Sequence, residues 1–156
     1  MGGSGAIGDI FSAILSKTNI HVEVIKGYVL PKTVDSKSLV VITSVSGNTE
    51  ETINVLESAV KINCKLIVFS SGGKLKQFCK KNEINFRKIP MIHSPRASFP
   101  LFLFGILNTL EPFLPIEKED IITSLTNLEK QKEKISSSNL NNKNPAISLA
   151  KWISDI

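Results

Sequence analysis

The sequence contains few of the residues from which disulfide frameworks and metal sites are built. Its 156 residues include only two cysteines and two histidines. Cys64 and Cys79 form no CxxC pair, and neither histidine stands where it would complete a set of metal ligands. We therefore expect both cysteines to be buried, reduced thiols of a cytoplasmic protein, and we expect neither a metal ion nor another cofactor.

Aromatic residues and long apolar runs are also scarce. The chain has one tryptophan and one tyrosine, and the lysines behind its net charge of +5 are spread along the sequence. A basic segment interleaved with aromatic residues, which would favour nucleic-acid binding, is missing. The most apolar stretch, FPLFLFGILNTLEPFL, is interrupted by Asn108, Glu111 and Pro112 and is too short to cross a bilayer. We therefore expect neither a nucleic acid nor a membrane as a partner.

Apolar runs of strand length alternate with segments of helical periodicity in the first part of the chain. Strands are expected at about residues 20–25, 38–43, 65–69 and 88–92, and a strongly apolar helix at 99–110. This alternation predicts an α/β fold in which a parallel sheet lies between two layers of helices. Ligands of such sheets bind beyond the carboxyl ends of the strands, so the loops at those ends are the candidate functional segments.

The character of the sequence changes after Pro115. We expect one domain over residues 1–115, an amphipathic helix over residues 116–138, and a polar linker followed by a new helix over residues 139–156. Asn144 suits the N-cap of that new helix, because a proline follows it at the first helical position. The sequence ends soon afterwards, so we expect the new helix to introduce a second half that is absent.

Three segments rich in serine and glycine, GGSG, SVSGNTEET and SSGG, are expected at strand ends or helix starts. Such loops offer backbone N–H groups, hydroxyl donors and the positive end of a helix dipole, which together bind a phosphate or another compact anion. The simpler interpretation is that Ser46 and Thr49 only cap a helix, with Glu50 and Glu51 in its first turn. One such loop would leave both interpretations open, whereas three together favour an anion site.

Two nucleotide-binding motifs can be tested on the same segments. Gly3, Gly5 and Gly8 satisfy GxGxxG literally, and Glu23 could serve as the acid that follows it in dinucleotide sites. That motif requires a strand before it, and only Met1 and Gly2 precede Gly3. The segment SSGGKLKQ lacks the GxxxxGK[ST] spacing of a P-loop. Both nucleotide sites are therefore disfavoured.

Four segments in order, MGGSGAIGD, VVITSVSGNTEET, SSGGKL and SPRASFP, resemble the sugar isomerase (SIS) domain, most of all that of the bifunctional phosphoglucose/phosphomannose isomerases. The resemblance covers residues 1 to about 115. It implies a flavodoxin-like αβα sandwich and the reversible conversion of glucose 6-phosphate or mannose 6-phosphate into fructose 6-phosphate. It also implies a hexose 6-phosphate as the ligand and a cytoplasmic homodimer as the full-length protein.

The resemblance also implies which residues meet the substrate. The implied substrate- and phosphate-binding residues are Ser4, Gly5, Ser44, Ser46, Gly47, Asn48, Thr49 and Ser71. Among them, Ser44, Ser46 and Thr49 supply the hydroxyls of the phosphate loop. Arg96, in SPRAS, matches the arginine that lies near the reacting carbon atoms, so it is the implied catalytic residue.

Isomerisation requires groups that this sequence does not offer. Moving a proton between C1 and C2 requires a carboxylate base, and opening the sugar ring requires an acid. The resemblance places a glutamate and a histidine for these tasks in a second half, which this chain lacks. His21 is expected on the surface of a strand. Of the two histidines, only His93 keeps contact with a ligand as an alternative interpretation. Glu50 and Glu51 are expected to be partners of a helix dipole rather than bases.

Two functions from different classes therefore stay open. The first is the phosphosugar-binding half of an isomerase, which alone would bind weakly and show no turnover. The second is a non-catalytic regulatory module that binds a sugar phosphate.

The resemblance further implies that the first strand of the sheet is missing, so we expect a gap or an exposed edge beside residues 20–25 or 38–43. The helix at 99–110, apolar on all sides, is expected to be core or a dimer face.

Overall fold

The computed structural model describes residues 4–141 and 143–154, without the side chain of Ser4. The chain divides into two compact units, the first ending at Pro115 and the second starting at Ile116. The first unit contains α1 (Ser4–Leu15), β1 (Leu39–Ser44), α2 (Glu50–Ile62), β2 (Lys65–Ser70), α3 (Gly73–Lys81), β3 (Asn85–Lys88), α4 (Phe99–Leu110) and the 3₁₀ turn η1 (Glu111–Phe113). The second unit contains α5 (Lys118–Ile135) and α6 (Pro145–Ser154).

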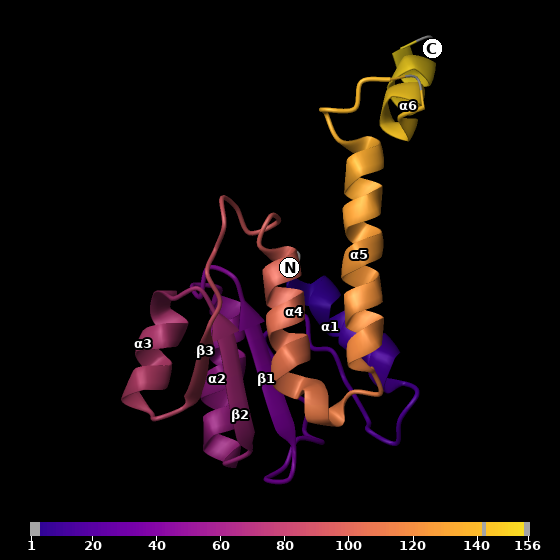
Figure 1. The fold of residues 1–156 in the computed structure, drawn as a ribbon. Coiled ribbons are helices and arrows are strands. Elements are labelled where there is room, and N and C mark those ends of the chain that lie inside the picture. The colour runs from indigo at the N-terminus through magenta and orange to yellow at the C-terminus, as the bar shows by residue number, and fades with distance from the viewer. Residues whose placement is uncertain (1–3, 142, 155–156) are drawn as a thin grey trace. The chain divides into compact units, whose positions relative to one another are not determined.

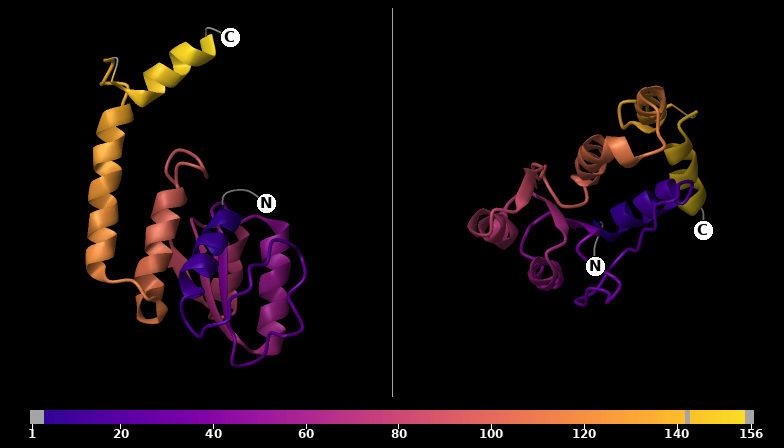
Figure 2. Two further views of the ribbon diagram at one scale, coloured as in Figure 1. Left: turned by 90° about the vertical axis from the view of Figure 1, so that its right-hand side faces the viewer. Right: turned by 90° about the horizontal axis from the view of Figure 1, so that it is seen from below.

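The first unit is built on a parallel sheet with the strand order β1-β2-β3. Helices α2 and α3 cover one face of this sheet, and α4 covers the other face with α1 packed beside it (Figures 1 and 2). Each strand-to-strand connection passes through a helix, as parallel strands require. The predicted α/β fold, a parallel sheet between layers of helices, is confirmed.

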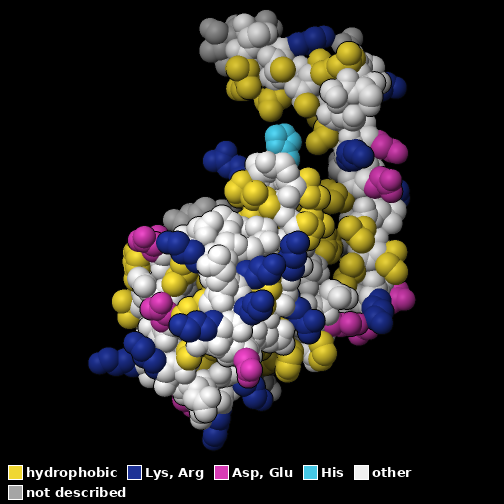
Figure 3. Space-filling model, turned by 90° about the vertical axis from the view of Figure 1, so that its left-hand side faces the viewer, with side chains coloured by type: hydrophobic (Ala, Val, Ile, Leu, Met, Phe, Trp, Pro, Cys, Tyr) yellow, Lys and Arg dark blue, Asp and Glu magenta, His cyan; other side chains and the backbone are white. Residues whose placement is uncertain are grey.

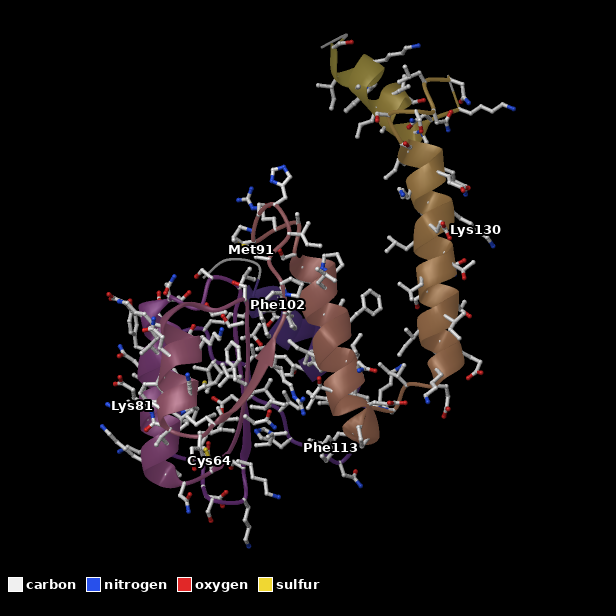
Figure 4. The ribbon with its side chains drawn as sticks, turned by 60° about the vertical axis from the view of Figure 1, so that its left-hand side comes forward. Cys64, Lys81, Met91, Phe102, Phe113 and Lys130 are labelled. Atoms are coloured by element: carbon white, nitrogen blue, oxygen red, sulfur yellow. The ribbon has the colours of Figure 1, made fainter. Side chains whose placement is uncertain are left out.

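Apolar side chains fill the space on both faces of the sheet. On one face a buried cluster joins β1 and β2 to α2 and α3; its members are Ile42, Leu56, Val68, Leu75 and Cys79. On the other face Phe102 is fully buried between α4 and the sheet (Figure 4). A side chain at Gly105 of α4 would lie 2.8 Å from Ile89, so the glycine lets α4 approach closely. The sheet is therefore held between two apolar layers, and its strand ends have fixed positions.

The two cysteines are buried and unpaired, as predicted. Cys79 is 1% exposed, and burial raises the pKa of its thiol from an ordinary 9.0 to about 11. Burial also raises the pKa of the Cys64 thiol. Neither thiol has the lowered pKa of a reactive cysteine, so both act as small apolar side chains of the core.

The raised pKa of Cys79 predicts a loss of stability at high pH. The folded chain binds the thiol proton more tightly, so this contribution is complete below about pH 9 and is lost as the pH rises toward 11. The free energy of unfolding should fall by roughly 2 kcal/mol over this window, at about 1.4 kcal/mol per pKa unit. Urea denaturation between pH 8 and pH 11 measures this decrease. Cys79→Ala should remove most of it, and an equal decrease in both proteins would contradict the assignment.

The strand predicted at residues 20–25 is absent, and this segment has no regular secondary structure. It packs against α1 instead, where a side chain at Gly8 would collide with Val24, and where Lys26 and Asp9 form an ion pair of 2.5 Å. An alternating apolar pattern forms a strand only when a neighbouring strand supplies hydrogen bonds. His21 is exposed, but in this irregular segment rather than on a strand.

The last predicted strand is shifted and is less buried than expected. Residues 88–92 were predicted, whereas β3 covers Asn85–Lys88 and only Phe86 is partly buried. The Ile89 amide donates a hydrogen bond to the Ser70 carbonyl at 3.0 Å. The next residue, Pro90, has no N–H with which to continue the pairing with β2. Proline therefore ends the strand, and the apolar residues after it belong to a surface segment.

The edge strand β1 and helix α4 agree with the sequence-based expectations. Among the described residues β1 pairs with β2 alone, and Leu39 and Val41 on it are 45% and 37% exposed. An exposed edge beside residues 38–43 was expected. The apolar helix at 99–110 is α4, and it buries Phe102, Ile106, Leu107 and Leu110.

The second unit is a pair of helices joined by a polar turn. A reciprocal capping box between Glu117 and Asp120 starts α5. Asn144 is 2% exposed and its Oδ1 accepts a hydrogen bond from the Ala146 amide at 2.9 Å, so it caps α6 as predicted. Within the described ranges, no helix combines the length and apolar character needed to cross a membrane.

Candidate functional site

The carboxyl ends of the three strands lie at one edge of the sheet. Ser44 at the end of β1 is paired with Ser70 at the end of β2, and Ser70 is paired with Lys88 at the end of β3. Three connections therefore leave the sheet at this edge (Figure 1): residues 45–49, residues 71–72 and residues 89–98. This is the edge at which parallel α/β sheets bind ligands.

The loop after β1 brings together the three predicted phosphate-binding hydroxyls. Ser44 is 3% exposed, and its Oγ lies 3.0 Å from Thr49 Oγ1. The Gly47 amide donates a hydrogen bond to Ser44 Oγ at 3.2 Å, and the Asn48 amide donates one to Ser46 Oγ at 3.3 Å. The hydroxyls thus shape the loop, and the exposed Ser46 lies on its solvent side.

The N-terminus of α2 has no side-chain cap. Thr49 occupies the N-cap position with an extended backbone, but its side chain makes no cap hydrogen bond. Its hydroxyl lies against Ser44 instead. The first amides of an α-helix have no partner within the helix, so those of α2 keep their capacity to donate to an anion. The geometry does not support the interpretation of Thr49 as a simple cap.

Glu50 and Glu51 occupy the first turn of α2, as expected for partners of the helix dipole. The charge of Glu51, which is also hydrogen-bonded to Tyr28, raises the pKa of the Tyr28 phenol. Both acids thus lie where negative charge stabilises the N-terminus of a helix.

Asn48 and Ser71 connect the loop after β1 to the loop after β2. Ser71 Oγ donates to the Val45 carbonyl at 2.6 Å. Asn48 Oδ1 accepts a hydrogen bond of 3.0 Å from the Lys74 amide at the start of α3. Two of the three serine-glycine segments are thus in direct contact, which the sequence did not show.

Arg96 lies in the segment between β3 and α4, which extends beyond the strand ends with Met91 (Figure 4). The Phe99 amide donates to its carbonyl at 3.2 Å, and its side chain is exposed. Over residues 4–141 and 143–154 no hydrogen bond or ion pair involves the Arg96 guanidinium. His93 is exposed with a left-handed backbone, φ of 57°. Both side chains are available to a ligand.

The first serine-glycine segment is less clearly connected to this edge. The side chain of Ser4 lies outside the described residues, although Ser4 begins α1. A side chain at Gly5 would meet Lys26 at 3.4 Å. In the part of the chain that the structure describes, no hydrogen bond joins Gly5 to the 44–49 loop. The assignment of Ser4 and Gly5 to the substrate therefore stays a prediction.

Positive charge gathers on the face formed by α3 and β3. Between Lys65 and Arg96 the sequence has eight basic residues and a single acidic one, Glu83. Lysine and arginine side chains accordingly crowd the face formed by α3 and β3 (Figure 3). Such a surface attracts anions in solution. No three His, Cys, Asp or Glu side chains within the described residues are placed to hold a metal ion.

No family model matches the chain, but curated proteins do. It is 40% identical over 119 residues to the bifunctional phosphoglucose/phosphomannose isomerase of Caldicellulosiruptor bescii, covering 72% of this chain and 35% of that protein. It is 34% identical over 137 residues to the enzyme of the same name from Aquifex aeolicus, covering 86% and 42%. The chain belongs to the same family as these isomerases. The resemblance found in the sequence is therefore confirmed.

Another relative in this family has a different reaction in its name. The D-glucosamine-6-phosphate 4-epimerase of Sulfolobus acidocaldarius is 34% identical over 112 residues, covering 69% of this chain and 35% of that protein. The chain thus spans less than half the length of each of these three relatives. What the chain shares with them is a part of each protein, and the names describe whole proteins.

Proposed function

We propose that the chain binds a hexose 6-phosphate and is the phosphosugar-binding part of an isomerase that interconverts glucose 6-phosphate or mannose 6-phosphate with fructose 6-phosphate. The observation that supports this most strongly is the 44–49 loop, where three hydroxyls stand before an uncapped helix N-terminus. Phosphate oxygens would accept hydrogen bonds from the first amides of α2 and from Ser46 and Thr49. The dipole of α2 favours the negative charge.

The relatives' names support a role in binding rather than in one particular reaction. One group is named for isomerisation and another relative for 4-epimerisation, yet all three names contain a phosphorylated sugar. A part that is shared across two reactions is best explained by what the substrates have in common. The 6-phosphate is that common group, and the 44–49 loop has the donors to bind it.

Arg96 is proposed to act on the reacting end of the sugar. In the isomerisation a base removes the proton from C2 of the aldose and returns it to C1, through an enediolate whose oxygens are negatively charged. A cation near those oxygens stabilises the enediolate more than the substrate. The Arg96 guanidinium is exposed and without a described partner, at the same edge of the sheet as the loop.

The base is proposed to lie elsewhere. Glu50 and Glu51 are in the first turn of α2, and Glu51 is engaged with Tyr28. This observation also favours the second candidate, a chain that binds the phosphosugar without turning it over. We therefore propose weak binding and no turnover for the 156-residue chain alone, and a cytoplasmic homodimer for the complete enzyme. Turnover by the purified chain would show that one of these acids serves as a base, and sedimentation equilibrium tests the dimer.

Thr49→Val tests the phosphate contact. Removing the hydroxyl should weaken the binding of glucose 6-phosphate and mannose 6-phosphate by the same factor, roughly 10-fold for one charge-assisted hydrogen bond. In an active enzyme that contains this chain, the change should raise KM and leave kcat nearly unchanged, because the phosphate is far from the reacting carbons. Isothermal titration calorimetry and steady-state kinetics measure the two effects.

Thr52→Val is the matched control, since Thr52 lies one turn further along α2. It should leave the affinity for both sugars unchanged. If Thr49→Val binds both sugars as tightly as the unmodified chain does, the phosphate does not contact this hydroxyl.

A further inference from the structure

Hydrogen bonds join the loop after β1 to the start of α3. The Leu75 amide donates to the Gly47 carbonyl at 3.0 Å, and the Ser71 amide donates to the Val45 carbonyl at 3.1 Å. The Lys74 amide donates to Asn48 Oδ1 at 3.0 Å. In each case the loop after β1 supplies the acceptor and the α3 side supplies the donor.

Two glycines make this contact possible. Gly47 and Gly73 both have left-handed backbones, with φ of 70° and 66°. A side chain at Gly73 would lie 2.6 Å from Asn48 Oδ1 and 2.6 Å from the Ser46 carbonyl. The two loops are therefore packed backbone to backbone, and a movement of either loop would break hydrogen bonds to the other.

This arrangement separates donors from acceptors around the loop. The first amides of α3 are used by Asn48 and Gly47, so the N-terminus of α3 is not free to bind an anion. The acceptors of these hydrogen bonds, the carbonyl oxygens of Val45 and Gly47 and the side-chain oxygen of Asn48, point toward the α3 side. Oxygen atoms that faced a phosphate would repel it, whereas α2 keeps its uncapped amides for the ligand.

We propose that Asn48 is a positioning residue, which caps α3 through Oδ1 and thereby fixes the loop that binds the phosphate. Asn48 then acts through the loop and does not contact the phosphate itself. This inference rests on the proposed function for the phosphate. Gly72, the N-cap residue of α3, has no side chain, so Asn48 supplies the cap from a different loop.

Amide hydrogen exchange and binding test this assignment together. Asn48→Ala should speed the exchange of the Lys74 amide about tenfold, as one protecting hydrogen bond is lost. It should also weaken the binding of both glucose 6-phosphate and inorganic phosphate about fivefold, because the loop is loosened. Asn48→Asp keeps an acceptor at the same place, and a carboxylate there suits the helix dipole, so it should restore the protection of Lys74.

Asn82→Ala is the control, because Asn82 donates to the Phe78 carbonyl at 2.8 Å at the other end of α3. It should change neither Lys74 exchange nor affinity. Weaker binding in Asn48→Ala with unchanged Lys74 exchange would overturn the proposal and make Asn48 a direct phosphate ligand. Unchanged affinity with faster exchange would overturn it as well. If the unmodified chain binds neither ligand, the proposed function fails, while Lys74 exchange still decides whether Asn48 caps α3.

Discussion

Replacing Gly47 by alanine is expected to weaken phosphosugar binding severely. Gly47 has a left-handed backbone, and a side chain there would collide with the Gly72 carbonyl and lie 2.5 Å from Ser70 Oγ. Backbone atoms of the neighbouring loop cannot move aside without breaking the contacts between the loops. The strain and the collision together should lower the free energy of unfolding by roughly 2–4 kcal/mol. The loop would relieve this strain by moving, which displaces the hydroxyls that we assign to the phosphate.

Calorimetric titration with glucose 6-phosphate and thermal denaturation should show both consequences, an affinity lowered at least about 100-fold and a lower Tm. Gly27→Ala is the control, because a side chain at Gly27 meets nothing within 4 Å. It should leave affinity and Tm nearly unchanged. A Gly47→Ala chain that binds normally would mean that the conformation of this loop does not matter for the ligand.

Replacing Arg96 by methionine should act on the chemical step. In an active enzyme that contains this chain, kcat should fall roughly 100-fold or more with both glucose 6-phosphate and mannose 6-phosphate, the scale of losing one preorganised charge contact. KM should change little, since the enediolate exists only along the reaction path. Steady-state kinetics with both sugars measure this separation.

Arg87→Met provides a matched loss of charge, because Arg87 is an exposed residue of β3 on the same basic face. It should lower kcat/KM only slightly and in a salt-dependent way, through weaker attraction of the substrate. Near-normal kcat in Arg96→Met on both sugars would make Arg96 a structural residue of the segment before α4.

Local sequence patterns were enough to predict two of the strands and the apolar helix. The apolar runs at 38–43 and 65–69 became β1 and β2, and the apolar helix at 99–110 became α4. The pattern at 20–25 failed, because a strand depends on a partner that local sequence does not specify, and this segment packs on α1 instead. At 88–92 the apolar pattern continues past Pro90, but proline has no N–H with which to pair, so β3 ends at Lys88.

For the candidate site, residue types could be predicted but contacts could not. The sequence showed that Ser44, Ser46 and Thr49 share one loop. It did not show that the Thr49 hydroxyl turns to Ser44 rather than to its own helix, since this depends on backbone angles. The cap from Asn48 to α3 depends on the register that pairs Ser44 with Ser70. The sequence did contain one signal for this contact, the glycines of GN in one loop and GG in the other. Glycine permits the positive φ that both loops adopt.

The most direct test of the account is a titration of the isotope-labelled chain with glucose 6-phosphate, followed by the chemical shifts of its backbone amides. We expect the largest shifts at residues 44–51, the same pattern with mannose 6-phosphate and with inorganic phosphate, and no shifts with unphosphorylated glucose. Shifts of equal size with glucose, or shifts that leave residues 44–51 unchanged, would contradict the claim that this loop binds the phosphate of a hexose 6-phosphate.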